Sequence, residues 1–202
     1  MSIKSIWIGG SAALLFSSFL SVGFAQPAST GTVYAQLAST DDQLATFDTI
    51  NQAIPIDIQS VDAISEMEWD PKNDKLTIKE DGIYFIMAVL QVGARENSTN
   101  IVKGGDIYFW LEQNGTAVAD SGSWVFASPS SRAKTITSQT VMPLKQGDAL
   151  RFIYSSSAPS MGLLTIAGEK NRPSSSGISV TVFKLNDSTP SASAGNVVPK
   201  SN

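Results

Sequence analysis

The chain has 202 residues, a net charge of −4, and 42% hydrophobic but only 16% charged residues, which suits one domain of ordinary size. It contains no cysteine and no histidine. Disulfide frameworks, thiol nucleophiles, cysteine-ligated metal sites and histidine-dependent triads are therefore excluded. The acidic balance also argues against a nucleic-acid partner, which needs a basic surface.

Residues 1–25 have the pattern of a secretory signal. Lys4 supplies the positive start, residues 6–24 are apolar or small, and a cleavage site follows Ala25. Serines and glycines interrupt the apolar run, so a cleaved signal is favoured over a transmembrane anchor. We expect no membrane span after cleavage and a secreted protein that is extracellular, periplasmic or bound to the cell surface. Because exported proteins without cysteine are ordinary in bacteria, we expect a bacterial source.

The remaining chain divides into three parts. Residues 26–31 form a short N-terminal segment, and residues 32–185 carry the alternating apolar pattern of a folded domain. A domain of this size buries about 70% of the surface that its unfolded chain exposes. Residues 186–202 form a polar tail of low complexity, which we expect to be disordered because it has little apolar surface to bury.

The domain reads as a series of short strands separated by turns rich in Gly, Pro, Asn and Asp. Apolar residues recur at every second position, and no segment shows a convincing helical stripe. We treat residues 41–51 as a loop. The pattern predicts an all-β sandwich or barrel. The expected strands are residues 32–38, 54–60, 75–79, 83–92, 106–113, 116–119, 135–144, 149–155, 162–167 and 177–185.

The segment 83–92 is apolar on both faces. On one face lie Ile83, Phe85 and Met87, and on the other lie Tyr84 and Ile86. A strand with one solvent-exposed face would instead alternate apolar and polar residues. Something must cover the second face, because it would otherwise form an exposed apolar patch. Periodicity leaves two interpretations open: a strand inside a closed barrel or beneath a long loop, and a strand at a subunit interface.

Four features resemble the globular head of complement C1q, the last of them the final strand, residues 177–185, which lies where the last strand of that family ends the domain. Residues 69–86 (WDPKNDKLTIKEDGIYFI) contain an aromatic-Asp-Pro turn, then Leu76, then Gly82 followed by Tyr84. Residues 111–115 (LEQNG) and 144–150 (LKQGDAL) are similar to two hairpins of that family. The resemblance extends over most of residues 32–185.

This resemblance implies a ten-strand jelly roll, shared with tumour-necrosis-factor-like proteins, that assembles as a homotrimer. By their position after Gly82, Ile83, Phe85 and Met87 would face the neighbouring subunit, while Tyr84 would fill the sandwich. A closed threefold ring joins two different patches of identical subunits. The resemblance therefore favours the subunit interface as the cover for the second apolar face.

Four aromatic residues are the candidate ligand-binding residues. Tyr108 and Trp110 alternate with a row of apolar residues that should face the core, so their own row is free to be exposed. Trp124 and Phe126 follow in a segment flanked by Ser and Gly, which we expect to be a loop. Exposed aromatic rings can stack on sugars or anchor a protein partner. The alternative is that these rings cap the sandwich or lie at the subunit contact.

Acidic residues are the only candidates for metal binding or catalysis. Asp70, Asn73 and Asp74 carry oxygen ligands suited to calcium, but their spacing matches no calcium loop and their residue types also favour turns. Asp41 and Asp42 are expected in a solvated loop. No pair of acids can be assigned to glycoside hydrolysis. We therefore expect no catalytic residues, no metal site and no cofactor.

The predicted function is that of a secreted, non-enzymatic, homotrimeric recognition module that binds a host protein, a receptor or a surface glycan through its loops. Its partners would be copies of itself and an unidentified protein or carbohydrate, with no nucleic acid. Three copies of a weak site gain avidity. The alternative is a structural surface protein of a bacterial envelope or spore coat.

Overall fold

The computed structural model describes residues 32–95, 104–128 and 133–186. The expected signal, the segment 26–31 and residues 187–202 of the expected tail lie outside these residues. The described residues form strands and turns without a helix, so none of them builds a helix able to cross a membrane. The prediction of an all-β fold is confirmed.

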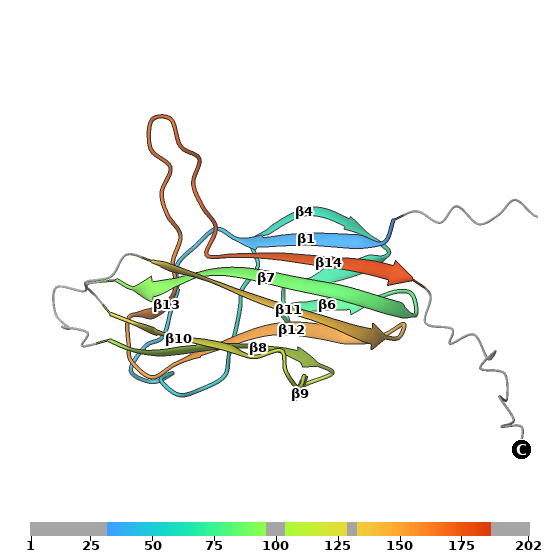
Figure 1. The fold of residues 1–202 in the computed structure, drawn as a ribbon, viewed down its shortest axis with the longest axis horizontal. Helices are drawn as coiled ribbons and strands as arrows, with labels where there is room; N and C mark the ends of the chain where they lie inside the picture. Colours follow the sequence, from blue (N-terminus) through green and yellow to red (C-terminus); the bar gives the residue numbers. More distant parts are fainter. Residues whose placement is uncertain (1–31, 96–103, 129–132, 187–202) are drawn as a thin grey trace, which may run out of the picture. The chain divides into compact units, whose positions relative to one another are not determined.

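The strands form two antiparallel sheets (Figure 1). Across sheet A the order is β11 (Lys134–Leu144), β7 (Gly82–Ala94), β14 (Ile178–Asn186), β1 (Tyr34–Ser39) and β4 (Ser60–Ser65), and β7 also pairs with β13 (Met161–Leu163), which pairs with β2 (Gln43–Leu44). Across sheet B the order is β10 (Ser123–Ala127), β8 (Gly105–Gln113), β12 (Ala149–Ser156), β6 (Lys75–Ile78) and β5 (Met67–Asp70), with β3 (Ile54–Pro55) on β12 and β9 (Thr116–Ala117) on β8.

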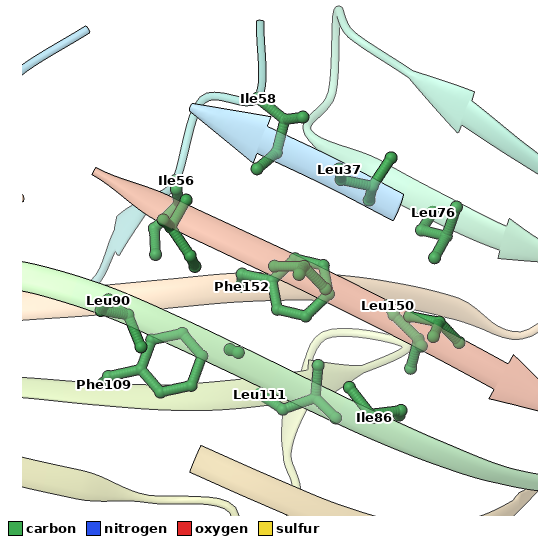
Figure 2. Packing of buried hydrophobic residues seen from close by; sticks show 14 of the residues in the cluster. Leu37, Ile56, Ile58, Leu76, Ile86, Leu90, Phe109, Leu111, Leu150 and Phe152 are labelled. Carbon is green, nitrogen blue, oxygen red and sulfur yellow. The ribbon is translucent and has the colours of Figure 1, made fainter. Parts of the chain in front are cut away.

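The hydrophobic core lies between the two sheets. Tyr84, Ile86 and Leu90 of β7 are 0–3% exposed and belong to the same cluster as Phe109 and Phe152 of sheet B. Figure 2 shows Ile86 and Leu90 of β7 meeting Phe109 and Phe152 of sheet B. Each buried side chain of this size stabilises the fold by roughly 1.5–3 kcal/mol.

The opposite face of β7 is only half-buried. Ile83, Phe85 and Met87 alternate along the strand with the core residues. In the described part of the chain, β7 lies inside an open sheet between β11 and β14. The closed-barrel interpretation is therefore wrong, and no described loop shields this face fully from solvent.

The strand boundaries differ from the expected ones in particular places. The described residues form fourteen strands rather than ten, because β2, β4, β5 and β10 were not expected. Strand β4 is the edge of sheet A and shows no clean alternation of burial, so its sequence gives a weak period-two signal. The expected strand over residues 54–60 shortens to β3, and residues 56–59 lie outside any strand.

A hydrogen-bonded cluster around Asp148 joins two hairpin turns. One carboxylate oxygen accepts bonds from the Lys145 backbone N–H and the Gln113 side chain, and the other accepts from the Asn114 side chain, all at 2.8 Å. Partial burial alone would raise the pKa of Asp148, but these bonds outweigh it and hold the pKa below its ordinary value. The two hairpin motifs that carry the sequence resemblance thus meet in one contact.

We predict that Asp148→Ala lowers the free energy of unfolding at pH 7 by about 1–2 kcal/mol, because it removes hydrogen bonds to a charged acceptor. The folded-state pKa is depressed, so this contribution is present above the unfolded-state pKa of about 3.9 and is lost as pH falls through the folded value. Urea unfolding at pH 7 and near pH 3 measures it. The exposed Asp41 provides the control variant Asp41→Ala. An equal difference at both pH values would contradict the role of the charge.

Candidate aromatic recognition site

The four aromatic candidates lie on one face of sheet B. Tyr108 and Trp110 belong to β8, and Trp124 and Phe126 belong to β10. Trp124 pairs directly with Tyr108 across the two strands, and paired residues share a face. The alternate residues of β8, such as Phe109, are buried in the core. All four aromatic side chains therefore lie on the face of sheet B turned away from sheet A.

Three of the rings are well exposed. Tyr108 is 45%, Trp124 64% and Phe126 50% exposed, although aromatic rings of this size are usually mostly buried. The rings of Tyr108 and Trp124 are stacked, with centroids 6.4 Å apart and planes inclined by 29°. We call Tyr108, Trp124 and Phe126 the aromatic surface.

Trp110 lies at the margin of the aromatic surface. Its side chain is half-buried, and it pairs with the fully buried Ile153 of β12. Ile153 in turn pairs with Pro55 of β3, which extends sheet B beyond β12 at this point. The structure thus brings all four predicted residues to one face but leaves Trp110 the least accessible of them.

The expectation that Trp124 and Phe126 lie in a loop is wrong. Both belong to β10, whose inward-facing residues include the buried Ala127. Because β10 is apolar on both faces, its sequence lacks the alternation that indicates a half-buried strand. The aromatic surface is therefore mounted on paired strands, a more rigid support than a loop.

A buried serine holds the chain in place before β10. Ser121 is 1% exposed, and its hydroxyl donates to the carbonyl of Val118 at 2.8 Å and accepts from the backbone N–H of Leu111 at 3.0 Å. The Ser138 hydroxyl of β11 donates to the Ser121 carbonyl at 2.8 Å. At the other end of β10, the Lys134 ammonium donates to the Phe126 carbonyl at 2.7 Å.

A second apolar surface crosses the outer face of sheet A. Tyr34 pairs with Phe183, Phe183 with Phe85, and Phe85 with Val141, so these four residues form a continuous row across β1, β14, β7 and β11. Tyr34, Phe183 and Val141 are 39%, 38% and 56% exposed, and Phe85 is half-buried. We call these four residues the sheet A row.

Sequence reasoning identified only part of the sheet A row. The predicted interface residues Ile83 and Met87 lie on β7 on either side of Phe85, on the same face of the sheet. Tyr34, Phe183 and Val141 were missed because the sequence does not show which strands are neighbours. A comparison of the second apolar face of β7 with the outer rows of all the expected strands could have found them.

Two of the acidic candidates, Asp70 and Asp42, have structural roles in the described residues. Asp70 accepts hydrogen bonds from the Asn73 side chain at 2.6 Å and the Lys72 backbone N–H at 3.0 Å, and these bonds lower its pKa, the Asn73 bond most strongly. Asp42 accepts from the Arg95 side chain and the Thr165 backbone N–H, both at 2.7 Å. No group of three or more acidic residues in the described ranges is arranged to hold a metal ion.

Two hollows lie away from the aromatic surface, at the base of a hairpin in which Ile166 pairs with Ser175. This hairpin projects from the sandwich as the orange loop of Figure 1. The hollows have volumes of about 640 and 190 Å³ and share Arg95, Thr165, Ile166 and Ala167 in their lining. Since Arg95 is already bound to Asp42, its guanidinium serves to fix the hairpin base.

Comparison with solved structures identifies the fold, whereas two sequence comparisons found no match. No model of a known protein family matches the chain, and no curated protein sequence matches it. Among solved structures, it is similar to the globular domain of zebrafish complement 1qA protein, with a TM-score of 0.50 and 12% sequence identity. The similarity covers 78% of this chain and 99% of that chain. The described residues therefore have the β-sandwich fold of a C1q globular domain, as the sequence motifs indicated.

Proposed function

We propose that this protein is a secreted, non-enzymatic recognition module that assembles as a homotrimer. The observation that carries this proposal is the presence of two separate exposed apolar surfaces on opposite faces of one sandwich. The sheet A row serves self-assembly, and the aromatic surface of sheet B serves ligand binding. Secretion is supported by the signal pattern of residues 1–25, and the C1q-type fold is compatible with both roles.

The sheet A row has the composition of a protein interface core. It contains aromatic and aliphatic side chains, with Ile83 and Met87 beside it, and it carries no charge. Burying apolar surface contributes roughly 25 cal/mol per Å², so a neighbouring subunit would gain from covering this face. In a threefold ring, each subunit would present the row to a different patch of its neighbour.

The aromatic surface lies on the opposite side of the sandwich from the sheet A row. The two surfaces belong to different sheets, and the common hydrophobic core lies between those sheets. A trimer closed through sheet A would therefore display three copies of the aromatic surface. Three weak contacts acting together raise the apparent affinity for a ligand that offers repeated sites.

We predict that Val141→Asp or Phe183→Asp converts the trimer into single chains at micromolar concentration. Both side chains are at least 38% exposed in one subunit, so the change should cost an isolated chain little stability while it places an unpaired charge in the interface. Analytical ultracentrifugation measures the mass.

The matched control is Phe47→Asp, at a side chain that is 62% exposed in the turn before β3. A wild-type protein that sediments as a single chain would refute the assembly, and a trimer unaffected by both row substitutions would refute the interface assigned to it. Circular dichroism confirms that each variant is folded.

We also predict that Trp124 remains open to solvent in the assembled protein. Iodide should quench its fluorescence strongly, and Trp124→Phe should remove most of the quenchable emission. Trp69→Phe is the control, because Trp69 is half-buried. Protection of Trp124 from iodide in the assembly, with exposure in the single-chain Val141→Asp variant, would assign the aromatic surface to the subunit contact instead.

A further inference from the structure

The aromatic surface consists of rings alone. Tyr108, Trp124 and Phe126 are all the exposed large apolar side chains that β8 and β10 contribute among the described residues. The sheet A row, in contrast, includes Val141 and lies beside Ile83. Aliphatic side chains pack well against irregular protein surfaces, whereas rings offer flat faces. A surface of rings alone therefore favours a ligand that has flat apolar faces of its own.

The aromatic surface also extends along two neighbouring strands. Side chains two residues apart on a strand are separated by about 7 Å, and neighbouring strands by about 4.8 Å. Trp124 and Phe126 are spaced in this way along β10, with Tyr108 beside Trp124 on β8. Neither of the two hollows at the base of the Ile166–Ser175 hairpin includes any of these rings. Small molecules favour concave sites, and protein anchor residues favour pockets, so this platform suits an extended polymer.

Polar side chains border the rings along the strands. Ser155 of β12 pairs with Tyr108 on the side away from Trp124, so a hydroxyl and two rings form one row across three strands. Asp106 pairs with Phe126 on the neighbouring row. A pyranose has apolar C–H faces and a rim of hydroxyl groups. Its faces can stack on the rings while its hydroxyls donate to the Asp106 carboxylate and exchange hydrogen bonds with Ser155.

The charges on this face disfavour the other stacking polymer, a single-stranded nucleic acid. Bases stack on aromatic rings, but tight binding also requires cations along the phosphate backbone. Asp106 and Glu112 lie in the same outward row of β8, where Arg151 of β12 forms an ion pair with Glu112 at 3.9 Å, and the whole chain has a net charge of −4. Lys134, the cation at the end of β10, already donates to the Phe126 carbonyl.

We propose that the aromatic surface binds a neutral, linear polysaccharide, whose pyranose rings stack on Trp124, Tyr108 and Phe126. This proposal rests on the recognition function proposed above and names its ligand class. Ser155 and Asp106 bind the sugar hydroxyls at the edge of the platform. Trp110, half-buried beside Ile153, supports the platform and makes little direct contact.

Affinity electrophoresis of the full exported chain tests this proposal. The gels contain hydroxyethyl cellulose, arabinoxylan, galactomannan or dextran as neutral polymers, and alginate as an anionic control. We expect retardation by at least one neutral polymer and none by alginate. Trp124→Ala and Phe126→Ala should each weaken binding about tenfold, since each removes a stacking contact. Tyr108→Phe keeps the ring and should retain most of the binding, and Phe47→Ala is the exposed aromatic control.

Sedimentation and thermal unfolding of the same samples separate the possible failures. If no neutral polymer retards a folded trimer, or if retardation survives both alanine substitutions, the polysaccharide proposal is overturned while the assembly stands. If Trp124→Ala dissociates the trimer, the rings belong to the subunit contact and the polysaccharide proposal fails. If an array of extracellular proteins gives a partner whose binding Trp124→Ala abolishes, and no glycan binds, the recognition function holds and the ligand class is wrong.

Discussion

The structure depends on the burial of one apolar layer that the two sheets share. Because side chains alternate along a strand, each sheet can turn only one face toward this layer, and the chain has no described helix with which to cover the other. An apolar residue that stays accessible to solvent on an outer face is therefore one that the packing of this layer does not use. Phe85 and Trp124 are in this position, and they need another explanation than core packing.

The two outer faces carry different kinds of apolar residue. Across sheet A, the sheet A row mixes aromatic and aliphatic side chains, a composition typical of contacts between proteins. Across sheet B, the exposed large apolar side chains of β8 and β10 are all rings, bordered by the polar residues Asp106 and Ser155. Because the sheet A row and the aromatic surface differ in this way, we infer that each surface contacts a different partner. An array of copies joined through both faces would require the rings to be buried as well.

Much of the fold could be predicted from local patterns, because turn residues and period-two segments are read directly from the chain. The long strand β7 was predicted nearly in full, with Tyr84 inward and Phe85 outward. The edge strand β4 and the doubly apolar β10 were missed, since neither sequence alternates cleanly between apolar and polar residues. The pairing and register of strands that are distant in sequence could not be predicted. Tyr34 and Phe183 are 149 positions apart in sequence and directly paired in space, and no local pattern predicts such a pairing.

Two of the predicted site residues, Trp124 and Phe126, lie on a strand and are held more firmly than residues of the expected loop would be. A loop would let Trp124 and Phe126 adapt to a ligand, at the cost of ordering them when it binds. On β10 they are held instead by pairing with β8 and by the bonds of Ser121 and Lys134 at the two ends of the strand. The rings are thus ordered before any ligand arrives, so less conformational entropy is lost on binding. A preordered set of rings gains most from a ligand that is itself stiff and repetitive, because neither partner must rearrange and successive repeats can contact successive rings.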